Sequence, residues 1–210
     1  MNVIPDVLAH IDPTADVRLF FKGRNVPPGD FVTSTISETV PRLNIQLFEK
    51  GEKLITVAVV DSDVPNVEKD GFDYRCHFLA VNIPISPTST SVDLATLVQD
   101  KQIILPWKAP YAQKGSPYHR LSTFVFVQKH GEILDVAELQ QKTKSENFIL
   151  RSFQTRHGSQ PIGAHLFRTQ WDEGMADVMK RAGVEGAEIQ FKRARLDPLP
   201  YKRRNPSSMR

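Results

Sequence analysis

The sequence contains a single cysteine, Cys76, and no long apolar run. One cysteine excludes an intrachain disulfide and a zinc site built from several cysteines, and it is typical of a reducing compartment. The longest apolar run, Ile55 to Val60, has the length of a strand and falls far short of the roughly 18 residues that a membrane-spanning helix needs. We therefore expect no membrane span. A chain of 210 residues can bury one good core, which favours one domain with extensions.

Basic residues are scarce at the start of the sequence. Residues 1–21 contain only Arg18 against three aspartates. This composition fits neither a secretory signal nor an Arg-rich, acid-poor transit peptide. If the protein enters an organelle, its targeting segment is expected to be missing from this sequence.

Positive charge is concentrated at the C-terminal end. Residues 192–210 contain seven basic residues and one acid, a net charge of +6, whereas the remaining residues contain 20 basic and 23 acidic groups. An acidic globule with a basic tail is typical of a polyanion-binding arm, and the alternative is a solvated terminus. We expect the segment to be disordered until it meets phosphates. The predicted RNA-binding residues are Lys192, Arg193, Arg195, Lys202, Arg203, Arg204 and Arg210.

Most of the sequence is typical of strands separated by turns. The predicted strands are 17–22, 43–48, 54–60, 77–83 and 123–128. The third and fourth of these are apolar on both faces, which indicates a sheet that is covered on both sides.

Helices are expected late in the chain. Trp171, Met175, Val178 and Met179 form one apolar stripe, and Gly183 stands where a helix would end. A second helix is predicted over 145–156, ending at Gly158. Its Phe148 and Phe153 should face inward.

The acidic run at residues 61–65 resembles the start of a calcium-binding loop but lacks the ligand pattern of an EF-hand. An EF-hand loop needs an oxygen ligand at its fifth position, a glycine at its sixth and a glutamate at its twelfth. Pro65, Asn66 and Phe72 occupy those positions. We therefore expect no metal.

No nucleophile paired with a base can be identified. Cys76 and His77 are adjacent, and adjacent residues of a strand point to opposite faces. The sequence contains no Gly-x-Ser-x-Gly elbow, Walker loop or dinucleotide fingerprint. We expect no enzyme activity and no cofactor.

Four segments together resemble the phosphatidylethanolamine-binding protein family: 54–65, 76–83, 115–128 and Trp171-Asp172. The resemblance implies a mainly β fold with a large central antiparallel sheet, a smaller sheet and C-terminal helices. In that family an Asp-Pro-Asp-x-Pro turn, a strand histidine and a Gly-x-Gly-x-His-Arg-Tyr segment line a pocket for phosphate or carboxylate head groups. The matching residues in this sequence are Asp61, Asp63, His77, His119 and Arg120.

The sequence departs from the family pattern around this pocket. Ser62 replaces the first proline of the acidic turn, Pro117 the second glycine of the histidine segment, and Leu121 its tyrosine. Tyr111 stands where the family has a glycine in the loop at the pocket mouth. We expect Asp61, His77 and His119 to lie together in a vestigial pocket that is narrowed by Tyr111 or its loop. No small-molecule substrate is expected.

A second resemblance extends outside the pocket. Residues 4–17, residues 162–172 and the basic end look like the fungal mitochondrial large-subunit ribosomal proteins that adopted this fold. The resemblance implies a structural constituent of the ribosome in the mitochondrial matrix that contacts ribosomal RNA and neighbouring ribosomal proteins. Such proteins normally carry a transit peptide and a long N-terminal extension, so this sequence is expected to begin at an internal start or to be partial.

The same resemblance suggests a division of the chain into an extended lead-in (1–16), a phosphatidylethanolamine-binding protein-like domain (17–190) and a basic extended tail (191–210). The alternative function is a free phospholipid- or anion-binding regulator of kinases or proteases. That alternative predicts an open pocket and has no use for the tail.

Overall fold

The fold is mainly β, as the sequence predicts. The structure is a computed structural model that describes residues 3–191. The smaller of its two sheets has the strand order β2-β1-β3-β6. The bounds of its strands are Ala15–Phe21 (β1), Arg24–Val26 (β2), Arg42–Leu47 (β3) and Ser91–Asp93 (β6). Neighbouring strands run antiparallel.

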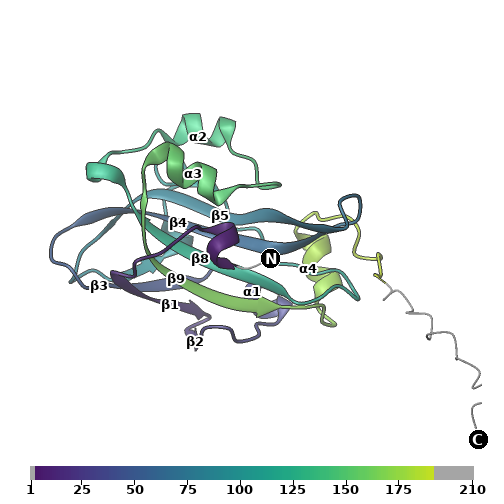
Figure 1. Cartoon of the computed structure of the whole chain (residues 1–210). Helices are drawn as coiled ribbons and strands as arrows, with labels where there is room; N and C mark the ends of the chain where they lie inside the picture. Colours follow the sequence, from purple (N-terminus) through teal and green to yellow (C-terminus); the bar gives the residue numbers. More distant parts are fainter. Residues whose placement is uncertain (1–2, 192–210) are drawn as a thin grey trace, which may run out of the picture.

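The larger sheet has the strand order β7-β5-β4-β8-β9, again with antiparallel neighbours. The bounds of its strands are Lys53–Asn66 (β4), Gly71–Ile85 (β5), Ile103–Leu105 (β7), His119–Val127 (β8) and Gln160–Thr169 (β9). All five predicted strands are therefore present, as β1, β3, β4, β5 and β8. The long hairpin of β4 and β5 forms the middle of the molecule (Figure 1).

Alternate residues of β4 enter two different hydrophobic cores. Ile55 and Val57 belong to the core between the two sheets. Ala58 and Val60 belong to a second core on the opposite face of the larger sheet. The expectation of a sheet covered on both sides is confirmed, because side chains alternate between the faces of a strand and both sets are apolar.

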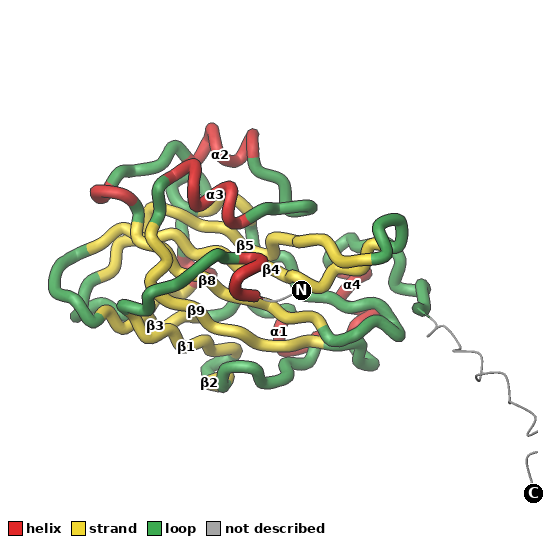
Figure 2. The backbone as a smooth tube through the Cα atoms, viewed as in Figure 1, coloured by secondary structure: helices red, strands yellow, loops and turns green. Residues whose placement is uncertain are grey.

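Two helices cover the face of the larger sheet that is turned away from the smaller sheet. They are α2 (Val136–Lys142) and α3 (Leu150–His157), and Figures 1 and 2 show them together on one side of the strands. The remaining helical segments are α1 (Ser34–Ser37), α4 (Met175–Arg181) and short turns at Val3–Val7, Leu94–Thr96 and Lys129–Gly131. Within residues 3–191, none of these segments has the length and apolar character needed to cross a bilayer.

The segment before β1 contains a turn. Ile4 is extended, with φ of −119° and ψ of 128°, the chain turns within Val3–Val7, and both Val7 and Leu8 are buried in the second core. Successive side chains of an extended chain point in opposite directions. A turn is needed for two adjacent residues to face the same core.

The helix predicted over 145–156 begins later, at Leu150. Residues 145 and 146 pair instead with β5, where the Cys76 N–H donates to the Ser145 carbonyl oxygen at 2.8 Å. The end of the helix is as predicted, because Gly158 takes up the left-handed conformation that closes it, with φ of +58°. Phe148 and Phe153 are buried, as expected.

The helix predicted from Trp171 also begins late, at Met175. The Asp172 carboxylate accepts hydrogen bonds from the Ser34 N–H at 2.7 Å and from the Gly174 N–H at 3.1 Å. Because these bonds tie the segment to α1, it cannot join the helix. The predicted apolar stripe is confirmed, since Met175, Val178 and Met179 are fully buried.

Strand β9 was not predicted from the sequence, and it brings the two sheets into close contact. The Thr14 N–H donates to the Ile162 carbonyl oxygen at 2.9 Å. A Cβ atom on Gly163 would lie 2.5 Å from Val17 Cγ2 and 3.0 Å from the Ala15 carbonyl oxygen. Glycine is therefore required at this position.

We expect Gly163→Ala to destabilise the protein by roughly 1–3 kcal/mol, because the added methyl group overpacks the contact between the sheets. Chemical denaturation followed by circular dichroism measures the change. The control is Gly71→Ala, where the nearest atom would be 3.6 Å from the added Cβ, and which should stay within about 0.5 kcal/mol of the wild type. Equal stabilities of the two variants would contradict the close-contact interpretation.

Candidate functional site

The strand order places three of the predicted site residues on one face of the larger sheet. Asp61 of β4 pairs with Arg75 of β5 and with Leu121 of β8. His77 and His119 each lie two residues from these pairing partners, and residues two apart on a strand share a face. The expected grouping of Asp61, His77 and His119 is present.

A short hydrogen bond joins two of these residues. The Nδ1–H of His119 donates to Asp61 Oδ2 at 2.7 Å, and the Asp63 N–H donates to Asp61 Oδ1 at 2.9 Å. Burial acts to raise the pKa of Asp61, but the charge and hydrogen bond of His119, with the nearby His77 imidazole, outweigh it and hold that pKa well below its usual range. Asp61 is therefore a buried carboxylate that keeps its negative charge.

His77 is oriented by a hydrogen bond to the backbone of Lys108. Its Nδ1–H donates to the Lys108 carbonyl oxygen at 2.8 Å. Its Nε2 faces Asp61 Oδ2 at 3.9 Å and has no hydrogen-bond partner among residues 3–191. Since a carboxylate lies on that side, the arrangement does not favour a second anion beside His77.

The other two predicted residues form a pair beside this group. Arg120 donates from Nε to Asp63 Oδ2 at 2.7 Å and from Nη2 to Asp63 Oδ1 at 2.6 Å. The Arg120 backbone N–H also donates to Asp63 Oδ2, at 2.9 Å. This bidentate pair engages both carboxylate oxygens of Asp63, so the carboxylate is already saturated.

Tyr111 packs against the site. Its ring meets the His77 ring edge-on at 6.1 Å between centroids, and the Arg75 guanidinium lies over the Tyr111 ring at 4.3 Å. Both Arg75 and Lys108 form ion pairs with Glu146, at 3.0 Å and 3.6 Å. The side chains of His77, Asp61 and His119 are 0%, 1% and 2% exposed.

Neither cysteine nor serine chemistry fits the site. Cys76 lies on the opposite face of β5, in the second core, and burial raises the pKa of its thiol to about 12. Ser116 was not singled out from the sequence, yet its Oγ lies 3.5 Å from His119 Nε2. That hydroxyl donates instead to the Gln113 carbonyl oxygen at 2.7 Å, and Pro117 offers no N–H to stabilise an oxyanion.

No group of three or more His, Cys, Asp or Glu side chains within residues 3–191 is arranged to hold a metal ion. The seven basic residues predicted to bind RNA, from Lys192 to Arg210, lie outside the described residues.

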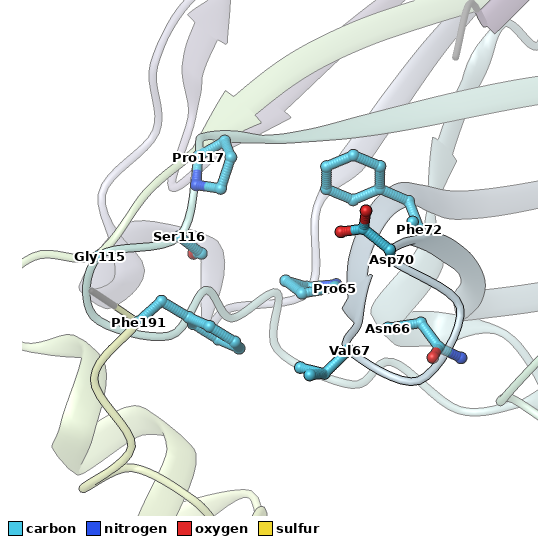
Figure 3. A pocket seen from close by; sticks show the side chains of 10 residues that line it. Pro65, Asn66, Val67, Asp70, Phe72, Gly115, Ser116, Pro117 and Phe191 are labelled. Atoms are coloured by element: carbon cyan, nitrogen blue, oxygen red, sulfur yellow. The ribbon is translucent and has the colours of Figure 1, made fainter. Parts of the chain in front are cut away.

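An open hollow of about 280 Å³ lies next to the closed site, and no sequence signal pointed to it. It is formed by the tip of the β4–β5 hairpin, by the segment that leads into β8 and by Phe191. Figure 3 shows Pro117 and Phe72 on opposite sides of its opening. Its lining is largely apolar, and Asp70 is the only charged side chain among the described residues that line it.

Comparisons with known proteins agree with the fold. The family model described as Phosphatidylethanolamine-binding protein matches residues 18–167. The solved phosphatidylethanolamine-binding protein from Plasmodium vivax superposes with a TM-score of 0.64 and 17% identity, over 81% of this chain and 93% of that chain. At this identity the likeness shows the fold alone.

Two curated relatives are similar in sequence. The large ribosomal subunit protein mL38 of Schizosaccharomyces pombe is 29% identical over 205 residues, which cover 95% of this chain and 63% of that protein. This chain therefore spans less than two thirds of that relative's length. A Drosophila melanogaster protein provisionally named odorant-binding protein A5 is 26% identical over 86% of this chain and 81% of its own length.

Replacing the buried carboxylate tests its structural importance. We expect Asp61→Asn to lower the free energy of unfolding at pH 7 by roughly 3–5 kcal/mol, because one member of a buried pair is removed and His119 is left without its partner. The exposed Asp70→Asn is the control and should change it by less than about 0.5 kcal/mol.

The pH dependence follows from the lowered pKa of Asp61. The unfolded chain takes up the proton first, so the contribution of Asp61 is fully present above its ordinary pKa of 3.8 and is lost as the pH falls further. The difference between wild type and Asp61→Asn should therefore shrink below about pH 4. Denaturant titrations over the acidic range measure it, and a constant difference would contradict a low pKa.

Proposed function

This chain belongs to the phosphatidylethanolamine-binding protein family, and we propose that it is a structural constituent of the large subunit of the mitochondrial ribosome. In this role it binds ribosomal RNA and neighbouring ribosomal proteins and catalyses no reaction. Its place is the mitochondrial matrix, where that particle works.

The observation that carries the proposal is the similarity to mL38, a large ribosomal subunit protein, along nearly the whole chain. It includes residues outside the family domain, both before β1 and after β9. Members of a fold family can differ in function, so a match that extends beyond the shared domain is more informative than the fold itself.

The closed site supports the same proposal. A head-group pocket needs an opening and donors that are free to meet an anion. Here Asp61 engages His119, Asp63 engages Arg120, and Tyr111 covers His77. We propose that these five residues of the family pocket are vestigial as a ligand site.

The chain then has three parts in this role. Residues 17–190 form the domain that occupies a place in the particle, residues 1–16 lead into it, and residues 191–210 are the RNA-binding arm. The arm's proposed contacts rest on its charge of +6, since arginine and lysine neutralise phosphates and release counterions. Such contacts fix position and do not read base sequence.

The alternative, a free phospholipid- or anion-binding regulator of kinases or proteases, has less support. It requires access to the site that is closed here, with side chains exposed by 2% or less. It also assigns no function to the basic arm.

Deleting residues 192–210 tests the arm. We expect the truncated protein to enter the large subunit poorly and its RNA binding to be less sensitive to salt, because about six phosphate contacts weaken binding on the order of a thousandfold between 50 and 200 mM salt. Sedimentation of mitochondrial extracts measures incorporation, and titration of RNA at several salt concentrations gives the slope. Normal incorporation with an unchanged slope would refute the arm's role.

Head-group binding tests the alternative. We expect no saturable binding when phosphorylethanolamine is titrated into the full chain in a calorimeter, because the site residues are already paired and covered. The variant Tyr111→Ala removes the ring that covers His77, and its head-group binding is compared with that of the wild type. Micromolar binding by the wild type that is lost in His119→Ala would favour the regulator over the ribosomal role.

A further inference from the structure

Two exposed aromatic rings and one arginine form a cluster at the start of β8 and the end of β9. Phe31 is 44% and Tyr118 46% exposed, and their rings meet edge-on at 5.9 Å. The Arg168 guanidinium lies over the Phe31 ring at 4.2 Å and over the Tyr118 ring at 5.4 Å. Exposed rings grouped in this way are unusual unless something covers them, since isolated surface apolar residues are the norm.

The cluster is held rigidly by the backbone. The Val32 N–H donates to the Arg168 carbonyl oxygen, and the Arg168 N–H donates to the Asp30 carbonyl oxygen, both at 2.8 Å. Arg168 Nε donates to the Gly29 carbonyl oxygen at 2.6 Å. A partner that binds here therefore loses little entropy in ordering the surface.

The charge around the cluster is positive and unpaired. Among residues 3–191, neither Arg168 nor the exposed Arg24 has a carboxylate partner. Arg24 and Phe31 line the same small hollow, which also includes Asp30, whose Oδ1 accepts from the Phe31 N–H. The two cations, Arg24 and Arg168, outnumber the one acid, Asp30, and this balance favours an anionic partner.

The root of the basic arm lies at the hollow that Pro117 also lines. The Phe191 N–H donates to the Lys114 carbonyl oxygen at 2.7 Å, so the end of the described chain is fixed there. Phe191 and Pro117 line the hollow in Figure 3, and Tyr118 follows Pro117 directly. An RNA held by residues from Lys192 onward would therefore meet the domain at this hollow, whose lining residue Pro117 directly precedes Tyr118.

We propose that Phe31, Tyr118 and Arg168 form a docking surface for an unpaired nucleotide of that RNA, with a base stacked on one of the two perpendicular rings and in edge contact with the other, and a phosphate near the guanidinium. Stacking on aromatic rings beside cations is how proteins recognise single-stranded RNA, and it tolerates any base. The inference rests on the proposed RNA-binding role and adds to it a site in the folded domain, separate from the arm.

The test uses the full chain and a fluorescein-labelled oligouridine, followed by fluorescence anisotropy at several salt concentrations. We expect Phe31→Ala and Tyr118→Ala to weaken binding about five- to a hundredfold with no change in the salt slope, because stacking releases no counterions. Tyr118→Phe keeps the ring and should bind like the wild type. The matched control is Phe48→Ala, which removes a 66% exposed ring at the end of β3.

The outcomes separate this inference from the proposed function. If deleting residues 192–210 lowers affinity and salt slope while both alanine variants bind normally, the docking surface is refuted and the arm stands. If neither the deletion nor the alanine substitutions alter RNA binding, the docking surface and the RNA-binding role of the arm are both refuted. Irradiation of wild-type protein with 5-iodouridine RNA provides a readout that needs no variant: crosslinks at Phe31 or Tyr118 support the surface, and crosslinks confined to other residues overturn it.

Discussion

Asp61 lies buried in the middle strand of the larger sheet, and its negative charge is tolerated there because His119, the backbone of Asp63 and the nearby His77 stabilise it. An unpaired charge in that position would cost several kcal/mol or would be neutralised by a proton. The pairing also determines the position of the start of β8, since His119 is its first residue. The segment before it, with the hollow and Tyr118, is therefore positioned by the buried hydrogen bond between His119 and Asp61.

The closure of this site changes what the fold can do. A sheet that presents two histidines and two aspartates could bind a small anion if their donors were free. Tyr111, pinned by Arg75 and the ion pair of Arg75 with Glu146, covers the group. In the role proposed above the interacting surfaces lie elsewhere, and the described chain offers the exposed aromatic rings of Phe31 and Tyr118 with Arg168 at the end of the sheet.

The sequence predicted a good part of the fold and of the site. Five strands and the two-sided burial of β4 follow from alternation, which is a local property. The grouping of Asp61, His77 and His119 was implied by the family resemblance. The predictions failed where side chains compete with the backbone. Asp172 ties the segment before α4 to Ser34, and residues 145 and 146 pair with β5, so both helices begin later than their apolar patterns indicated. Strand β9 was not predicted, because the alternation of apolar residues alone does not identify an edge strand that packs on β1.

The sequence by itself determined the chemical types at the site, the strand periodicity and the concentration of positive charge in residues 192–210, because each of these is a property of neighbouring residues. Only the tertiary structure decided that the site is closed, that the Ser116 hydroxyl turns to Gln113, and that Phe31, Tyr118 and Arg168 meet. These contacts join segments brought together by strand order and loop packing. No local pattern encodes them, since they depend on how the whole chain buries its apolar surface.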